Sequence, residues 1–299
     1  MKALWQLFLL GIVGATAQAA NPALVLRVAD SINPGTGDYL LSGMEAAEKK
    51  QASYVVIVLD TPGGLLTTTR QIVQKMLNSQ VPIVVYVGPR GAHAGSAGAL
   101  ITLAADVAVM APATQIGAAH PVSGTGESEG SKDSVLQTKI VNDTAAFAES
   151  LAKTRGRNAE WAIQAVRSSA SVIAEEALKQ GIIDAMAEDT EALKTKLAGF
   201  RFKTPKQALG ELPKENVVWE EFPMGVRHRL VSFFADPNLA YLILSLGMLC
   251  LWIELSHPGL TAPGVVGVRT AGCKRPDHAQ RAASGSNALS VNERYTSLK

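Results

Sequence analysis

Residues 54–64, with the sequence YVVIVLDTPGG, decide the fold expected for this chain. The first six residues form an apolar, largely β-branched run, which is typical of a strand covered on both faces of a parallel sheet. Pro62, Gly63 and Gly64 then predict a tight turn before the helical pattern of residues 65–78. A buried strand that leads into a helix in this way indicates an α/β fold whose active site lies at the carboxyl ends of the strands.

The same order of strands and helices continues on both sides of this stretch. Further strands are expected at residues 23–28, 82–87, 107–112 and 182–187, and helices at 37–51, 65–78, 96–105, 136–154, 159–166, 174–180 and 191–198. Because parallel strands need crossover connections, this order predicts a mostly parallel sheet with right-handed crossovers.

Composition narrows the possible functions. The 299 residues are 47% hydrophobic, so the chain can form a sizeable core rather than stay disordered. A formal net charge of +2 argues against a dedicated nucleic-acid binder. Two cysteines cannot form a disulfide framework, and no cysteine and histidine cluster has the spacing of a metal site.

The N-terminus has the features of an export signal. Lys2 precedes an apolar stretch at residues 3–13, and Ala17-Gln18-Ala19 matches a cleavage site. The stretch is shorter than the roughly 20 apolar residues of a membrane span. We therefore expect residues 1–19 to be a signal peptide that is removed before Ala20, with the protein exported.

The C-terminal part predicts a membrane anchor. Residues 20–199 form the expected α/β domain, and the proline-containing residues 200–234 are interpreted as a linker. The 17-residue apolar run at 239–255, LAYLILSLGMLCLWIEL, predicts a transmembrane helix within residues 235–267, although a buried core helix would give a similar pattern. Residues 268–299 are polar and nonperiodic, which predicts a disordered, cytoplasmic tail.

Ser96 is the first candidate for chemistry. It lies in the sequence Ala-Gly-Ser-Ala-Gly at residues 94–98 and begins the helix that follows the strand at 82–87. Small neighbours suit a nucleophile that a carbonyl group must approach closely, whereas a serine at this position can also be only a helix cap. The sequence does not fit G-x-S-x-G, so it gives no support for an α/β-hydrolase.

Five other residues accompany Ser96. On the helix expected at 136–154, Lys139 shares a face with Asp143, four residues later. His120 follows the strand at 107–112 and His93 precedes Ser96, and either histidine can be structural. Asp60 ends the central strand, where it could orient the glycine turn, although a structural role is the simpler interpretation.

Several of these motifs together resemble one family. The matching segments are DTPGG at 60–64, AGSAG at 94–98, IGAAHP at 116–121, EEAL at 175–178, GIID at 181–184, ADPN at 235–238 and ELSHPG at 254–259. In this order they resemble the NfeD family of membrane-bound serine proteases, also called stomatin operon partner proteins. The resemblance covers roughly residues 23–267 and implies a Clp-protease/crotonase-like fold.

The resemblance also implies residue roles. Ser96 would be the nucleophile and Lys139 the general base of a Ser-Lys dyad, and the backbone N–H groups of Gly64 and Ala97 would form the oxyanion hole. A lysine base must be desolvated to work near neutral pH. His120 is the competing base, because soluble Clp proteases use a histidine at a similar place in the fold.

Partners and location follow from the same resemblance. The substrate would be an apolar segment of a stomatin-like membrane protein, with no cofactor, no metal and a homodimer as a plausible assembly. The protease domain would lie on the exported side of a bacterial cell membrane. A non-catalytic scaffold for the stomatin-like protein is the alternative, and a crotonase-type acyl-CoA enzyme is a third. Beyond Gly267 the chain departs from the family, as a truncated or altered C-terminus would.

Overall fold

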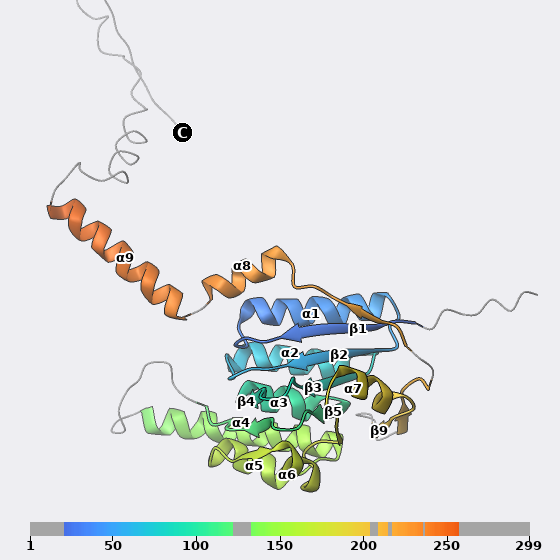
Figure 1. Ribbon diagram of the computed structural model, residues 1–299. Coiled ribbons are helices and arrows are strands. Elements are labelled where there is room, and N and C mark those ends of the chain that lie inside the picture. Colours follow the sequence, from blue (N-terminus) through green and yellow to red (C-terminus); the bar gives the residue numbers. More distant parts are fainter. Residues whose placement is uncertain (1–20, 122–132, 204–208, 215–216, 236, 257–299) are drawn as a thin grey trace, which may run out of the picture. The chain divides into compact units, whose positions relative to one another are not determined.

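The computed structural model describes residues 21–121, 133–203, 209–214, 217–235 and 237–256 (Figure 1). The chain divides into two units, one up to Leu239 and one from Ala240 onward. The expected signal peptide at 1–19 and the expected tail at 268–299 lie outside the described residues.

A six-stranded parallel sheet organises the first unit. Its strands occur in the order β11-β1-β2-β3-β5-β8, and every neighbouring pair is parallel. The strands are β1 (Ala23–Val28), β2 (Tyr54–Leu59), β3 (Ile83–Val87), β5 (Val107–Met110), β8 (Ala185–Met186) and β11 (Trp219–Glu221). The expected α/β fold with a parallel sheet is confirmed.

The helices between these strands cover one face of the sheet. From β1 to β8 the strand order advances in one direction, so right-handed crossovers place every connecting helix on the same side. Figure 1 shows α1, α2 and α3 following one another along the sheet, and they contribute to one buried cluster with α4 and α5. The helices are α1 (Pro34–Lys49), α2 (Leu66–Asn78), α3 (Ala97–Ala104), α4 (Asp133–Arg155), α5 (Ala159–Arg167) and α6 (Ala174–Lys179).

The opposite face has a separate core made with later parts of the chain. Alternate strand residues such as Val56, Val84 and Tyr86 point to this side. They pack with residues of α7 (Thr190–Leu197) and of β9 (Arg201–Lys203), which pairs antiparallel with β10 (Leu209–Glu211). The parallel sheet is therefore buried on both faces, as its continuous apolar strands predict.

A small second sheet holds the loops that follow β3 and β5. It consists of β4 (His93–Gly95), β6 (Gln115–Gly117) and β7 (Ser171–Ile173), with β4 parallel to β6 and β7 antiparallel to β6. Each strand has only three residues, which is too short for a periodic pattern, and the sequence analysis did not predict them. Their pairing places the residue after β4, Ser96, beside Gly117.

Within the segment expected as a linker, residues 200–234, the described parts pack against the domain. It forms β9, β10, β11 and α8 (Val226–Phe234). Strand β11 extends the sheet beside β1, and Tyr39 secures the chain after it by donating a 2.7 Å hydrogen bond to the Phe222 carbonyl. Burial raises the pKa of Tyr39, which keeps its hydroxyl group neutral as a donor. These elements are short and depend on distant partners, so local sequence patterns do not reveal them.

Helix α9 (Pro237–Ser256) includes the apolar run at 239–255. Across the ranges that the structure describes, no helix combines the length and apolar character needed to cross a membrane. The structure therefore confirms a helix here but does not support the prediction that it is a transmembrane helix.

Two buried arginines join the end of α4 and the residues after it to the end of α3. Arg155 forms an ion pair with Asp106 and donates a 2.8 Å hydrogen bond to the Ala104 carbonyl. Arg157 donates hydrogen bonds to the Leu103 and Ala105 carbonyls, each of 2.8 Å. The last carbonyl groups of a helix have no partner within the helix, so these guanidinium groups satisfy them where water is excluded.

We expect Arg155→Ala to lower the free energy of unfolding by about 3–5 kcal/mol, because it leaves the buried Asp106 carboxylate without its partner. Urea denaturation of the full chain measures this change. Lys153→Ala is the matched control on the same helix, since its ion pair with Glu149 is exposed and contributes less than about 0.5 kcal/mol. Equal effects of the two substitutions would contradict the assignment.

Candidate active site

The loop after β2 is held against the strand that leads to Ser96. Thr61, the second residue of this loop, donates a 2.8 Å backbone hydrogen bond to the His93 carbonyl and accepts one of 2.9 Å from the Gly95 N–H. Asp60 accepts a 3.1 Å hydrogen bond from the His93 N–H. The carboxylate therefore fastens the two loops together, in keeping with the structural role expected for it.

Gly63 and Gly64 allow this loop to pass close to its neighbours. Their φ angles are +126° and +154°, which side chains rarely permit. A β-carbon on Gly63 would lie 2.6 Å from the Cβ atom of Ser96, and one on Gly64 would lie 2.2 Å from the Ile32 carbonyl oxygen. The backbone of Ile32 brackets the turn, since it donates to the Gly63 carbonyl and accepts from the Leu65 N–H.

Ser96 has a strained backbone conformation at the start of α3. Its φ of +48° and ψ of −107° lie outside the regions that L-residues normally occupy. Its N–H donates a 2.9 Å hydrogen bond to the Gly117 carbonyl, which fixes its backbone. Such strain occurs where the surroundings enforce it, frequently at active sites.

The side chain of Ser96 does not cap its helix. The structure therefore contradicts the helix-cap interpretation and leaves the half-buried hydroxyl group available for chemistry. A β-carbon on Gly63 would lie 3.2 Å from Ser96 Oγ, so this turn borders the hydroxyl group directly.

Two backbone N–H groups near Ser96 remain available as donors. Ala97 is the first residue of α3, so its N–H has no partner within the helix. Neither this group nor the N–H of Gly64 donates a hydrogen bond within the described part of the chain. Unused N–H groups at a glycine turn and a helix N-terminus are suited to binding a developing oxyanion.

His120 is oriented by a backbone carbonyl. Its Nδ1 donates a 2.9 Å hydrogen bond to the Val166 oxygen, so in the neutral ring Nε2 carries the lone pair. The side chain is partly buried and follows β6, whose Gly117 contacts Ser96. His120 is thus arranged to accept a proton, although no described contact joins it to Ser96.

Lys139 lies near the N-terminus of α4 and is exposed. Its ammonium group forms no ion pair or hydrogen bond with the described residues, and no described contact joins it to Ser96. Asp143, which shares its helical face, instead pairs with Arg70 at 2.5 Å. The structure therefore brings Gly63 beside Ser96, with Gly64 next to it in the same turn, but shows no contact between Ser96 and Lys139. The burial that a lysine base requires is not present in this structure.

The residues that support Ser96 were not predicted from the sequence. The hydrogen bond to the Gly117 carbonyl and the contact with Gly63 both form between segments that are distant in the sequence. The sequence indicates only that several glycines follow the ends of strands. The Asp60 contact with the His93 N–H was likewise not predicted. Among the residues with described positions, no group of three or more His, Cys, Asp and Glu could hold a metal ion.

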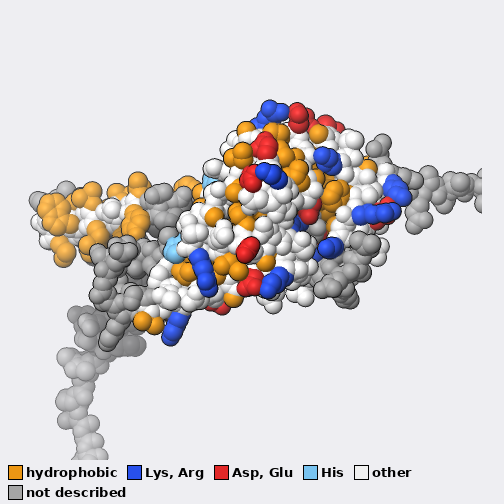
Figure 2. All heavy atoms as spheres, turned by 90° about the horizontal axis from the view of Figure 1, so that it is seen from below, with side chains coloured by type: hydrophobic (Ala, Val, Ile, Leu, Met, Phe, Trp, Pro, Cys, Tyr) orange, Lys and Arg blue, Asp and Glu red, His pale blue; other side chains and the backbone are white. Residues whose placement is uncertain are grey.

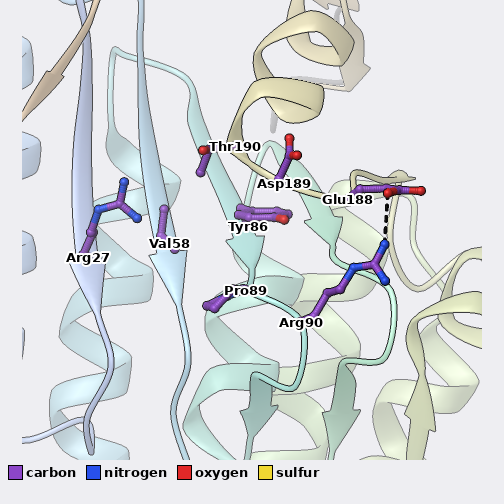
Figure 3. Close-up of a pocket in the computed structure, with 8 residues that line it drawn as sticks. All are labelled: Arg27, Val58, Tyr86, Pro89, Arg90, Glu188, Asp189 and Thr190. Carbon is purple, nitrogen blue, oxygen red and sulfur yellow. Dashed lines mark hydrogen bonds and ion pairs between the residues drawn. The ribbon is translucent and has the colours of Figure 1, made fainter.

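A pocket of about 630 Å³ lies on the face of the main sheet that packs against α7 and β9 (Figure 3). Val58 and Tyr86 belong to the core on that face, whereas Ala94 and Ala97, which flank the Ser96 loop, belong to the helix-covered face. Burial raises the pKa of Tyr86, and its hydroxyl group donates a 3.1 Å hydrogen bond to the Ala187 carbonyl. This pocket is therefore separate from the Ser96 site.

The sequence is similar to known membrane proteins. The profile described as NfeD1b, N-terminal domain, matches residues 23–217. The membrane-bound protease PH1510 of Pyrococcus horikoshii is 36% identical over 252 residues, which are 83% of this chain and 56% of that protein. The membrane protein NfeD1b of Bacillus subtilis is 26% identical over 275 residues, 89% of this chain and 59% of that protein. This chain therefore spans little more than half the length of these relatives.

Solved structures with the same fold include proteases. The 1510-N membrane-bound stomatin-specific protease, as a lysine-to-alanine mutant in complex with a substrate peptide, gives a TM-score of 0.65 at 33% identity, covering 73% of this chain and 99% of that chain. A serine-to-alanine mutant of the same protease gives a TM-score of 0.62 at 33% identity, covering 69% of this chain and 99% of that chain. The 1510-N membrane protease of Pyrococcus horikoshii, specific for a stomatin homolog, gives a TM-score of 0.62 at 31% identity, covering 72% of this chain and 99% of that chain.

We expect Gly63→Ala to reduce the rate at which Ser96 reacts with a serine-directed fluorophosphonate by about 100-fold, because the new methyl group displaces the serine. Mass spectrometry of the labelled protein measures the rate. Gly91→Ala is the control, since Gly91 also has a positive φ but a β-carbon there meets nothing within 4 Å. Unchanged labelling of Gly63→Ala would show that the close approach is not needed.

Proposed function

We propose that this chain, which belongs to the NfeD family through its NfeD1b N-terminal domain, is a serine peptidase that acts at a membrane. The strained Ser96 carries the proposal, because its hydroxyl group is not used as a cap and lies beside the Gly63 turn. Relatives named as membrane-bound and stomatin-specific proteases support the same activity and location.

The proposed mechanism uses a Ser-Lys dyad. Ser96 Oγ attacks the carbonyl carbon of the scissile peptide bond while its proton passes to the neutral Nζ of Lys139. The N–H groups of Gly64 and Ala97 donate hydrogen bonds to the oxyanion. When the C–N bond breaks, Lys139 returns the proton to the leaving amine. Water then hydrolyses the ester and regenerates Ser96.

The choice of base rests on two opposing observations. Lys139 is exposed, so the dyad requires a bound peptide to cover it and bring it to Ser96. His120 is already oriented by the Val166 carbonyl and is the alternative base. We favour Lys139, because the solved protease that was bound to a substrate peptide is a mutant in which lysine was exchanged for alanine.

We assign an apolar segment of a stomatin-like membrane protein as the substrate class. The names of the solved relatives support this assignment, since they specify stomatin or a stomatin homolog. The expected signal at residues 1–19 supports a peptidase domain on the exported side of the membrane. A Clp-protease-like fold and a homodimer remain part of the proposal.

A non-catalytic scaffold for the same partner is the second candidate. The specific observation in its favour is the exposed Lys139, which has no described contact with Ser96. In that case the glycine turn and Ser96 would bind a peptide without cleaving it.

Substitution of the candidate residues distinguishes these possibilities. We expect Ser96→Ala to abolish cleavage of an apolar peptide and Lys139→Ala to lower kcat by about 10²–10⁴-fold, because a general base contributes that much. His120→Ala should lower kcat less than about 10-fold, since it removes only a neighbouring side chain in this mechanism. The measurement is cleavage by the full chain of a peptide from a stomatin-like C-terminal segment.

Lys153→Ala is the matched control, because Lys153 is an exposed lysine on the same helix as Lys139. An essential His120 with a dispensable Lys139 would move the base to the histidine. If the folded wild-type chain binds the peptide but cleaves nothing, the scaffold replaces the peptidase.

A further inference from the structure

Helix α8 packs on the domain through its polar side. His228 and Ser232, four residues apart, face α1 and are largely buried. The Ser232 hydroxyl group donates a 3.1 Å hydrogen bond to Asn33 Oδ1, and His228 Nε2 lies 3.5 Å from an Asp38 oxygen. A β-carbon on Gly35 would lie 2.3 Å from Ser232 Oγ, so this glycine permits the close packing.

The opposite side of α8 is apolar and exposed. Val226, Leu230 and Phe234 recur at intervals of four residues, and Phe233 lies beside them on the helix. Their exposed fractions range from 53% to 74%. A surface helix normally turns its apolar side to the core, so α8 has the reverse orientation.

Arginines flank this apolar side. At 100° per residue, Arg227 and Arg229 lie at its two edges, and both are exposed. The Arg227 guanidinium group lies 3.5 Å from an Asp38 carboxylate oxygen, while α8 itself contains no acidic residue. On the face of the molecule in Figure 2, by contrast, basic and acidic side chains are interspersed among apolar ones.

We propose that α8 is an interfacial helix that inserts its apolar side into the headgroup region of a bilayer containing anionic phospholipids. The apolar residues would enter the boundary between headgroups and acyl chains, while the arginines at the edges extend to the phosphates. The inference rests on the proposed membrane location and adds the surface of the domain that meets the lipid.

The size and surroundings of α8 favour a bilayer over a second protein. Nine residues give a helix only about 14 Å long, so the exposed side of α8 alone is too small to supply the roughly 800 Å² per partner that a stable protein interface needs. Attachment to lipid requires only a few inserted apolar side chains together with positive charge. The chain also continues two residues later into α9, whose exposed side chains include Tyr241, Leu242 and Ile243.

A fluorescent label tests the insertion directly. In the full chain with Cys250→Ser and Cys273→Ser, Phe233→Cys carries an environment-sensitive nitrobenzoxadiazole label. Vesicles of equal parts phosphatidylcholine and phosphatidylglycerol should shift its emission to the blue and raise it severalfold. The same label at Lys179→Cys, on the exposed side of α6, should not respond.

Three further variants test which side chains of α8 are responsible for the insertion. Leu230→Gln combined with Phe234→Gln should abolish the response of the label at position 233, with the fold intact because both side chains are exposed. Arg227→Gln and Arg229→Gln should each weaken partition into anionic vesicles by about 5-fold, and have little effect on neutral vesicles.

The outcomes separate this inference from the peptidase proposal. A chain that floats with vesicles without a response at position 233 overturns the interfacial role of α8 and leaves a membrane location in place. A response that appears without vesicles and grows with protein concentration also overturns it, since a second copy then covers the helix. A vesicle-dependent response in a chain that cleaves no peptide supports α8 while the proposed activity fails.

Discussion

The close approach of Gly63 to Ser96 is the constraint on which the site depends. The segments that follow β1, β2, β3 and β5 meet there, and backbone hydrogen bonds hold them together. Ile32 holds the glycine turn, Thr61 holds the strand before Ser96, and the Gly117 carbonyl holds Ser96 itself. Any β-carbon at the turn would push these segments apart. The strain at Ser96 is therefore maintained by the parts of the fold that bring the strand ends together.

The order of the strands explains why the site has such a rigid support. Because the crossover helices gather on one face, the segment after Ser96 becomes α3 within the larger core, and every residue of α3 is buried. The other face is completed by α7 and the β9–β10 pair, and it carries the separate pocket. An element such as α8 can thus pack at the edge of the domain, against α1, without disturbing the loops around Ser96.

Long apolar strands and periodic helices could be predicted from the sequence, because their patterns are local. Ser96 could be proposed as a nucleophile from its small neighbours, but its positive φ and its bond to Gly117 come from tertiary contacts. The face shared by Lys139 and Asp143 was correctly placed on one helix, yet Arg70 of α2 takes the carboxylate. Three-residue strands such as β4 and β11 have no periodicity to recognise.

The pairing of β11 with β1 joins residues almost 200 positions apart, such as Ala23 and Trp219. Until β11 is synthesised, β1 has an open edge made of apolar residues, the kind of edge that pairs readily with other chains. The ordering entropy of so distant a contact also delays its formation. A shortened chain that ends before Trp219 would therefore keep Ser96 and its glycine turn, and yet be prone to aggregate through its first strand.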